Sequence, residues 1–527
     1  MAPHSPTSEP SPAKKLWDKA WGKPWPHQSL GNVSIQELSS DGDVPMSIET
    51  DEDNVAVSPN STSWQYTCLH RIHEVVAACL GDIGIVQDVL VIRPEYVWLR
   101  ETIETGYLRR DKAIVVMGHP GIGKTVFLLQ LLLHRLEHKL PTAIHLFGEY
   151  LVVFNDEGAM IRGAKDIIQL ASDHWALSDF NDSIEKPCGA FRRSAARIIQ
   201  VSSPRPDRWE EWTNQRTASI IVTDLPRPLE IGAIVKELGL NVAETNRYFS
   251  QWGPCTRTIL DLLSRSFDSR LAAEDNYIQA AQTAAEVICA HPDAYANPVT
   301  IMAPSVGLTI LFVVPYRPLV PGTSRVARSV RSIYHIPTTY LSETLNSVRQ
   351  SLANENALQL FQALSLHSLT RPAAAWKFEQ SVHVHLSSNS PPLSIFNQHQ
   401  VSEMVPSQQL LAGTAAALAR CREFSSFYWL PSTSNFPGVD GVLANRRNVY
   451  AVQANIADEY NSPEQGLQKV WAMFDQEVRD QRVWHVVFVA HSKTLASRYV
   501  ATYAKELKDF ALGQDKVNVW GCVLPSS

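Results

Sequence analysis

The chain lacks the features that mark secreted or membrane-spanning proteins. Its seven cysteines are scattered and none forms a Cys-x-x-Cys pair, so their spacing indicates neither a zinc site nor a disulfide framework. The Pro- and Ser-rich start holds no apolar signal segment. The longest uncharged run, residues 298–316, is interrupted by Pro304, Gly307 and Pro315, so it predicts a buried strand rather than a membrane span. We therefore expect an intracellular protein, in the cytoplasm or nucleus, with no membrane partner.

A strong charge of either sign is also missing. The 527 residues carry a net charge of −6, so the whole-chain charge gives no argument for nucleic-acid binding, and any basic surface would have to be local. A chain of this length predicts about three domains. Its hydrophobic content of 45% is sufficient for more than one core.

One stretch, residues 112–137, carries a specific signal. Residues 112–117 form a short, apolar, β-branched run that predicts a buried parallel strand. Residues 126–135 are apolar, largely straight-chain and free of Gly and Pro, which predicts a helix. Between the two lies the phosphate-loop pattern Gly118-His119-Pro120-Gly121-Ile122-Gly123-Lys124-Thr125.

The residue types of this loop suit a nucleoside triphosphate. Its glycines allow backbone N–H groups to turn onto phosphate oxygens, and the following helix adds the positive end of its dipole. Lys124 can reach the β- and γ-phosphates, and the Thr125 hydroxyl can ligate Mg²⁺. Because the strand and helix that this chemistry requires flank the loop, we predict that it binds ATP, or another nucleoside triphosphate, with Mg²⁺.

The residues after the loop alternate between strand and helix patterns. Strands are expected at 142–147, 150–154, 159–161, 174–179, 195–204 and 218–224, with a helix at 230–238. This alternation predicts a parallel, doubly wound sheet, in which ligands bind at the carboxyl ends of the strands. Gly118, Asp179, Ser202 and Ser203 are expected to meet there, and Ser203 is a candidate nucleotide contact.

Asp179 is the candidate for the acidic group that orders Mg²⁺ through water, although a turn or helix-capping aspartate is the alternative. Many hydrolysing members of this fold place Glu directly after that Asp, whereas Phe180 follows here. Asp182 is a substitute only if the turn is shifted. Nucleotide turnover is therefore less strongly indicated than nucleotide binding.

Residues 241–297 are predicted to form a helical lid. Arg257 lies at the start of a helix within it and is a candidate contact for the γ-phosphate, or else a surface arginine. Residues 298–366 are interpreted as a connector. Its four arginines suit either a phosphate backbone or a solvated loop (Arg317, Arg325, Arg328 and Arg331).

Residues 367–527 predict a second α/β domain. Helices are expected at 373–386, 414–424, 464–474 and 495–507, strands at 426–430, 438–443, 448–456, 483–490 and 517–524, and a polar loop at 387–410. A restriction-endonuclease-like core places Glu on its first helix, then Asp, then Glu or Gln two residues before Lys, to hold Mg²⁺ and orient water. The candidates are Glu379, Asp440 and Gln453. Neutral Asn455 stands at the Lys position, with Lys469 as a substitute; the alternative is an ordinary α/β interaction domain.

The N-terminal part differs in composition from the rest. Residues 1–62 are rich in Pro, Ser, Asp and Glu and are predicted to be disordered. Within them, residues 14–25 interleave Trp with Lys, which suits contact with a partner or nucleic acid as well as a tail without function. Residues 63–110 show helical periodicity and lead into the strand before the phosphate loop.

Taken in order, these parts resemble the Crinkler and retrotransposon-hot-spot type of eukaryotic protein, which joins an AAA+/STAND-like P-loop ATPase to a restriction-endonuclease-like, PD-(D/E)XK, domain. The resemblance covers about residues 85–527. It depends on the phosphate loop, the strand ending in Asp179, Ser202-Ser203-Pro204 followed by Trp209 and Trp212, the helix at 377–383, and Asp440 with Gln453. It implies nucleotide binding and a DNA-directed activity, in some members as secreted or nuclear effectors. Phe180, Asn455 and the lack of the usual N-terminal header depart from the pattern.

The sequence thus predicts an α/β protein. A disordered tail (1–62) precedes a parallel-sheet P-loop NTPase core (63–240), its lid, a connector and the restriction-endonuclease-like domain. The expected function is that of an ATPase whose nucleotide state gates a nuclease-like, DNA-facing domain. One alternative is a non-enzymatic nucleotide switch or scaffold with an inactive nuclease-like domain, and another is an active Mg²⁺-dependent endonuclease. The partners considered are ATP with Mg²⁺, DNA, other proteins and a second copy of the chain. A kinase is less favoured because no second substrate site is visible.

Overall fold

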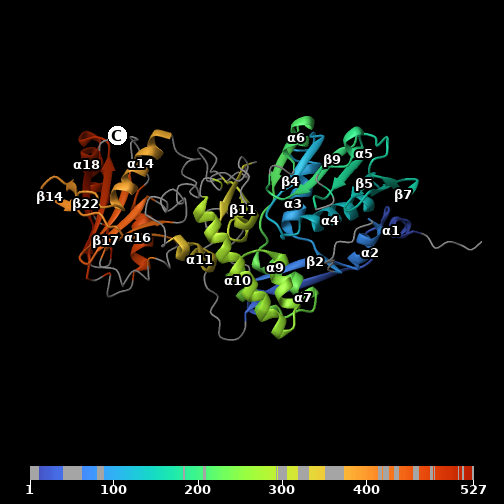
Figure 1. The fold of residues 1–527 in the computed structure, drawn as a ribbon, viewed down its shortest axis with the longest axis horizontal. Coiled ribbons are helices and arrows are strands. Elements are labelled where there is room, and N and C mark those ends of the chain that lie inside the picture. Colours follow the sequence, from blue (N-terminus) through green and yellow to red (C-terminus); the bar gives the residue numbers. More distant parts are fainter. Residues whose placement is uncertain are drawn as a thin grey trace, which may run out of the picture. The chain divides into compact units, whose positions relative to one another are not determined.

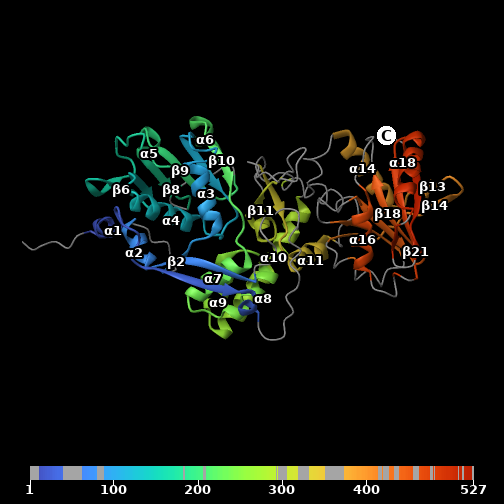
Figure 2. The same ribbon diagram turned by 180° about the vertical axis from the view of Figure 1, so that it is seen from behind.

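A computed structural model describes most of the chain and divides it into two compact units (Figures 1 and 2). Unit 1 comprises Met1–Ile278 and Pro298–Thr338, and unit 2 comprises Gln279–Asn297 and Thr339–Ser527. The described residues are 11–39, 62–79, 88–181, 184, 186–205, 209–291, 294, 305–317, 331–349, 373–413, 418, 426–431, 438–454, 462–474, 479, 481–508, 510–512 and 515–524. In these ranges no helix combines the length and the apolar character needed to cross a membrane.

Unit 1 is built on a seven-stranded sheet with the order β10-β4-β9-β8-β5-β6-β7. Its strands are β4 (Ala113–Met117), β5 (Thr142–His145), β6 (Tyr150–Asn155), β7 (Gly158–Gly163), β8 (Trp175–Ser178), β9 (Arg197–Ser202) and β10 (Ser219–Val222). The five strands from β10 to β5 run parallel, whereas β6 and β7 add antiparallel pairs at one edge. The predicted α/β class is confirmed, and the sheet is mixed rather than wholly parallel.

Helices cover both faces of this sheet, as a parallel sheet requires. They are α3 (Pro94–Glu104), α4 (Lys124–Glu137), α5 (Gly189–Arg193) and α6 (Glu210–Arg216). Along β4, Ile114 and Val116 join the core beneath α3 and α4, while Val115 joins the core that contains Phe191 of α5 and Trp212 of α6. The strand that leads into the phosphate loop is therefore buried on both sides.

The prediction of a disordered tail is wrong for residues 11–39. They form α1 (Pro12–Ala20), β1 (Gln28–Ser34) and the 3-10 helix η1 (Ile35–Leu38). The Trp17 indole N–H donates to the carbonyl of Asn155, and that of Trp25 donates to the carbonyl of His70, both at 2.8 Å. Leu16 and Trp25 are buried. The interleaved Trp and Lys residues thus encode an amphipathic segment whose aromatic side anchors it to the domain.

The segment between this tail and the phosphate loop is only partly helical, contrary to its predicted periodicity. It contains β2 (Ser63–His70), α2 (Ile72–Ala78), β3 (Val89–Val91) and α3. The strand β2 pairs antiparallel with both β1 and β3 in a second, three-stranded sheet. Aromatic and β-branched residues at the start of β2, including Trp64, Tyr66 and Thr67, favour strand over helix.

The segment after β10 is largely helical, as expected. It holds α7 (Pro228–Glu237), η4 (Val242–Glu244), α8 (Thr245–Trp252), α9 (Thr256–Ser264) and α10 (Phe267–Ala290). The segment that follows includes η6 (Ser305–Thr309), an antiparallel pair of β11 (Phe312–Pro315) with β12 (Ser332–His335), and α11 (Thr339–Arg349). The assignment of the helices to a lid stays a prediction.

Unit 2 contains an eight-stranded mixed sheet with the order β14-β13-β22-β19-β18-β17-β16-β15. The strands are β13 (Leu393–Phe396), β14 (Val401–Met404), β15 (Leu410–Gly413), β16 (Ser426–Pro431), β17 (Gly441–Asn445), β18 (Asn448–Ala454), β19 (Val483–Ala490) and β22 (Asn518–Val523). The antiparallel run β16-β17-β18 continues into β19 and β22, which are parallel to β18. A short pair, β20 (Ala511–Leu512) with β21 (Asp515–Lys516), lies outside this sheet.

Helices also cover the two faces of the second sheet. The side chains of α14 (Ala373–Leu386) enter one core, and those of α16 (Glu464–Met473) and α18 (Lys493–Glu506) enter the other. The predicted loop at 387–410 is wrong, because β13, β14 and the start of β15 lie there. The strands β13 and β14 have four residues each, and β14 shows three exposed residues before buried Met404, so its burial does not alternate.

Candidate functional site

The phosphate-loop residues connect the carboxyl end of β4 to the first turn of α4. Gly123 precedes the helix with a φ of 99°, and Gly121 has a φ of 79°, both in the left-handed region that L side chains rarely adopt. A Cβ on Gly123 would lie 2.3 Å from the Tyr96 hydroxyl oxygen. Backbone conformation and packing therefore both require glycine at this position.

Residues from two other helices hold the loop. The Arg93 guanidinium, just before α3, donates from Nη1 to the carbonyl of Ile122 at 2.9 Å, and the Tyr96 hydroxyl donates to the carbonyl of Gly123 at 2.9 Å. Arg93 also forms a buried 2.6 Å ion pair with Glu230 of α7. Burial alone would lower the pKa of Arg93, but the negative charge of Glu230 raises it.

These three supporting residues were not predicted from the sequence. Arg93 and Tyr96 precede the loop by about one helix and one strand, and Glu230 follows it only after the rest of the sheet. The available signal was a cation beside proline at the start of a helix, followed by a strand and the phosphate loop. It does not specify that the arginine points back toward that loop.

The predicted lid contacts the loop through its backbone. The N–H of Arg257 donates to the carbonyl of Gly121 at 3.1 Å, and the Cys255 thiol donates to the carbonyl of Pro120 at 3.7 Å. Burial raises the pKa of Asp179, and the positive charge of Arg257 partly opposes that rise. The start of α9 is thus next to the phosphate loop, and contact between the Arg257 side chain and a phosphate stays a prediction.

His119 has a structural position in the loop. Its ring stacks on Phe312 with 3.8 Å between centroids, and only 3% of the residue is exposed. Burial, with a smaller effect from the charge of Lys124, lowers the pKa of His119 well below its usual value. A neutral imidazole supplies no positive charge to a phosphate, so the cationic side chain of the loop is Lys124.

Lys124 and Thr125 bind different groups: Lys124 donates to backbone carbonyls, and Thr125 donates to a carboxylate. The Lys124 ammonium donates to the carbonyls of Gly118 at 2.8 Å and His119 at 2.7 Å. The Thr125 hydroxyl donates to Oδ2 of Asp179 at 2.7 Å, and the Phe180 N–H donates to Oδ1 of the same carboxylate at 2.8 Å. The structure therefore brings together two of the predicted Mg²⁺ ligands, which are far apart in sequence.

The Asp179 carboxyl group is almost completely buried. Burial raises its pKa from 3.8 to about 6, against the opposing effects of the Thr125 and Phe180 hydrogen bonds and the charges of Lys124 and Arg257. A buried carboxylate that remains difficult to ionise is typical of a functional site or of a structural ion pair. Here the partner is a hydroxyl rather than a cation, which fits a position where a metal ion would restore the charge balance.

Several buried polar atoms at the neighbouring strand ends have no hydrogen-bond partner. They are the hydroxyls of Ser178, Ser202 and Ser203 and both amide atoms of Gln200. Ser178 pairs with Gln200, and Ser202 pairs with Met117, so these residues line the carboxyl ends of β8 and β9 beside the loop. Buried polar groups without partners are rare. Their presence here fits a polar ligand, and Asp182 lies outside the described residues.

Two of the candidates of unit 2, Glu379 and Asp440, lie near the same buried tyrosine, Tyr428. Glu379 on α14, Asp440 just before β17 and Gln453 on β18 are exposed by 1%, 5% and 1%. Oδ2 of Asp440 accepts the N–H of Ala454 at 2.8 Å. Asn455 lies outside the described residues. Lys469 is exposed on α16, and α16 packs on the face of the sheet opposite to α14. Its role as a substitute for the missing Lys stays a prediction.

Two further residues of this cluster, His383 and Tyr428, were not predicted. His383 lies one turn after Glu379, with 3.5 Å between its Nε2 and Oε1 of Glu379, and its Nδ1 is 2.7 Å from the Tyr428 hydroxyl. Burial, followed by the negative charges of Asp440 and Glu379, raises the pKa of Tyr428 well above its usual value. The i, i+4 spacing of Glu379 and His383 was the available signal.

Comparison with known proteins adds little to this description. No family model and no curated protein matches the sequence. Among solved structures, the chain is similar to a variant of RuvB from Thermotoga maritima, with a TM-score of 0.24 and 11% sequence identity, over 37% of this chain and 73% of that one. A similarity this low gives no evidence of function, so the functional argument depends on the residues of the two sites.

Proposed function

We propose that unit 1 binds ATP with Mg²⁺ at residues 118–125. The observation that carries the proposal is the 2.7 Å hydrogen bond from the Thr125 hydroxyl to Asp179, which joins the two predicted metal ligands directly after the loop. The partnerless hydroxyls and amide at the ends of β8 and β9 support the same position. When bound, Mg²⁺ would neutralise charge on the phosphate oxygens.

Different residues would bind the phosphates and the metal ion. Backbone N–H groups of the loop and the Lys124 ammonium would bind the phosphates, with Lys124 leaving the carbonyls of Gly118 and His119. Thr125 and Asp179 would hold the metal ion, and Ser203 and Arg257 are the further candidates for polar contact. Arg93 and Tyr96 hold the loop from its other side, so binding requires no rebuilding of the loop.

The wider proposal is that unit 1 is an ATPase whose nucleotide state gates a nuclease-like, DNA-facing unit 2. The order of the two units and the resemblance to Crinkler-type proteins support it, together with the convergence of Glu379 and Asp440 near Tyr428. The test is phosphate release by the full chain, with and without duplex DNA, beside Lys124→Ala. Lys165→Ala, which removes an exposed lysine of unit 1, is the matched control. Turnover that DNA stimulates and only Lys124→Ala abolishes is the expected result.

A nucleotide switch without turnover is the second candidate. Phe180 favours it, because its side chain supplies no general base directly after Asp179. Its backbone N–H donates to that carboxylate. A switch predicts that ATP raises the melting temperature according to RT ln(1 + [L]/Kd) while no phosphate is released. Sustained phosphate release that Lys124→Ala abolishes would contradict it.

A metal-dependent endonuclease is the third candidate. The two buried carboxylates Glu379 and Asp440, both close enough to Tyr428 to raise its pKa, favour it. It predicts cleavage of DNA with Mg²⁺ or Mn²⁺ that Asp440→Ala abolishes. Glu403→Ala, which removes an exposed carboxylate on β14 of the same unit, should leave cleavage unchanged. No cleavage by the wild-type chain with either metal would exclude this candidate.

A further inference from the structure

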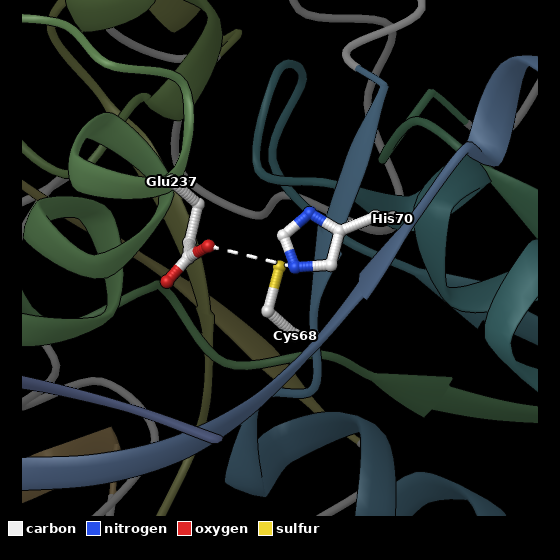
Figure 3. A group of neighbouring side chains, drawn as sticks. All are labelled: Cys68, His70 and Glu237. Carbon is white, nitrogen blue, oxygen red and sulfur yellow. Dashed lines mark ion pairs between the residues drawn. The ribbon is translucent and has the colours of Figure 1, made fainter. Parts of the chain in front are cut away.

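A second cluster of metal-binding side chains lies in unit 1, outside the phosphate-loop site. Cys68 and His70 stand two residues apart on β2, so their side chains share one face of the strand. Glu237, the last residue of α7, faces them. Figure 3 shows the thiol, the imidazole and the carboxylate pointing toward one another. One ligand atom from each residue lies within 4.8 Å of the other two.

From this arrangement we infer that Cys68, His70 and Glu237 bind a zinc-class divalent cation. Zinc sites combine thiolate, imidazole and carboxylate ligands, and tetrahedral bonds of 2.0–2.3 Å would place the ligand atoms about 3.3–3.8 Å apart. The His70 Nε2 and Glu237 Oε2 atoms are already 3.8 Å apart. Small movements of these side chains therefore suffice to form the site, with a water molecule as the fourth ligand.

The surroundings of the cluster suit a cation. Glu237 is a negative charge at the carboxyl end of a helix, where the helix dipole is also negative, so a positive ion there is stabilising. The next residue back, Lys236, points elsewhere and binds Glu37 at 2.6 Å. Cys68 is fully buried, whereas 37% of the His70 side chain is exposed, which leaves an entry path and room for a water ligand.

A neighbouring residue already orients one of the three ligands. The Tyr66 hydroxyl donates to Oε1 of Glu237 at 2.8 Å, which leaves Oε2 to face His70. The Ser29 hydroxyl is 2.8 Å from Nε2 of His70 and would have to give way to the metal. A ligating carboxylate that accepts a hydrogen bond of the kind Tyr66 donates is typical of protein metal sites. The cation would also displace the thiol proton of Cys68.

The position of the site indicates a structural role. A metal ion here would join the three-stranded sheet to α7, and α7 also carries Glu230, which pairs with Arg93 behind the phosphate loop. The inference does not depend on nucleotide binding. Cysteine spacing alone could not indicate this site, because its third ligand comes from a distant helix.

The test uses Co²⁺ and Zn²⁺ with the full chain. A thiolate ligand gives Co²⁺ an intense near-ultraviolet charge-transfer absorption, which the wild-type chain should show at one equivalent and lose when Zn²⁺ is added. The band should be absent in Cys68→Ser. It should persist in Cys188→Ser, which removes another buried thiol of unit 1. It should also persist in His138→Ala, which disrupts the His134, Glu137 and His138 group at the end of α4.

Two milder variants protect the test against misfolding. Glu237→Gln keeps the shape of the side chain and should lose the band, while Tyr66→Phe keeps all three ligands and should weaken Zn²⁺ binding about 10–100-fold. Zn²⁺ should raise the melting temperature of the wild-type chain and of the two control variants. No band in the wild-type chain, a band that survives in Cys68→Ser or Glu237→Gln, or Zn²⁺ affinity unchanged in Tyr66→Phe would overturn the inference.

Discussion

The phosphate-loop site of unit 1 and the carboxylate cluster of unit 2 differ in how their polar groups are used. At the loop, hydroxyls and an amide at the ends of β8 and β9 are buried without partners, and the Lys124 ammonium donates to two carbonyls of its own loop. In unit 2, Asp440 accepts a backbone N–H, and Glu379 lies next to His383, which contacts Tyr428. The first arrangement places these buried groups beside a phosphate loop, whereas in the second Asp440, Glu379 and His383 already contact groups of their own unit.

This difference has a consequence for reading function from residue types. Buried carboxylates occur in both sites, yet Asp179 accepts a hydrogen bond from the hydroxyl of Thr125, the last residue of the phosphate loop. Asp440 and Glu379 have the composition of a metal site but also the contacts of a buried polar core. The strongest tests therefore change residues that hold the phosphate loop in place, the carboxylate expected to bind the metal ion, and the tyrosine at the centre of the unit 2 cluster.

The largest effect is expected for Arg93→Ala, which tests how strongly the Arg93–Glu230 pair stabilises the structure around the phosphate loop. The variant leaves Glu230 buried without its partner and removes the donor to the carbonyl of Ile122, so the free energy of unfolding of unit 1 should fall by about 3–5 kcal/mol. Urea denaturation followed by tryptophan fluorescence measures this. Lys236→Ala breaks an exposed ion pair with Glu37 and should cost less than about 1 kcal/mol. Equal losses in the two variants would show that the framework is not held by this pair.

The next effect, a gain in stability, is expected for Asp179→Asn. The folded-state pKa of about 6 lies above the usual 3.8, so between about pH 4 and 6 the folded chain binds more protons than the unfolded chain. The stability of the wild-type chain should therefore fall as pH rises through this window and stay lower above it. Without nucleotide, the variant should be more stable than wild type by about 1–3 kcal/mol at pH 8, and by less at pH 5.

The same variant should lose the stabilisation that Mg²⁺ with ATP gives the wild-type chain. Unfolding at pH 5 and pH 8, with and without the ligand, separates the two effects. A variant that is equally destabilised at both pH values would contradict the assignment of Asp179 as a buried carboxylate that is maintained for ligand binding.

A smaller loss is expected for Tyr428→Phe, which examines the network of unit 2. Removing the hydroxyl deprives Nδ1 of His383 of its 2.7 Å partner, so the free energy of unfolding should fall by about 1–2 kcal/mol. Tyr450→Phe, in the same sheet, is the control. If Tyr428→Phe leaves the free energy of unfolding unchanged or raises it, the hydroxyl is not maintained for stability. It would then be a candidate to contact a ligand near Asp440 and Glu379, as the polar groups beside the phosphate loop are.

The features that could be predicted from the sequence depend on residues close together in the chain, and the features that were missed depend on contacts between distant segments. The strand, glycines and helix around Lys124 are contiguous, so local rules were sufficient for the loop. Trp17 and Trp25 were assigned to a disordered tail because their partners, Asn155 and His70, lie far along the chain. The short strands β13 and β14 were missed because four residues give a weak pattern, and the edge strand β14 has three exposed residues. The roles proposed for Arg93 and Cys68 depend on Glu230 and Glu237 of α7, which lie far along the chain.

The most direct test of the central claim is equilibrium binding of ATP to the full chain in the presence of Mg²⁺, measured by calorimetry for wild type, Lys124→Ala and Lys165→Ala. If residues 118–125 form the nucleotide site, Lys124→Ala should weaken binding by at least about 100-fold, because a charged contact to phosphate is worth roughly 3 kcal/mol. Lys165→Ala should bind as wild type does. Unchanged ATP affinity in Lys124→Ala, or no binding by the wild-type chain, would contradict the account.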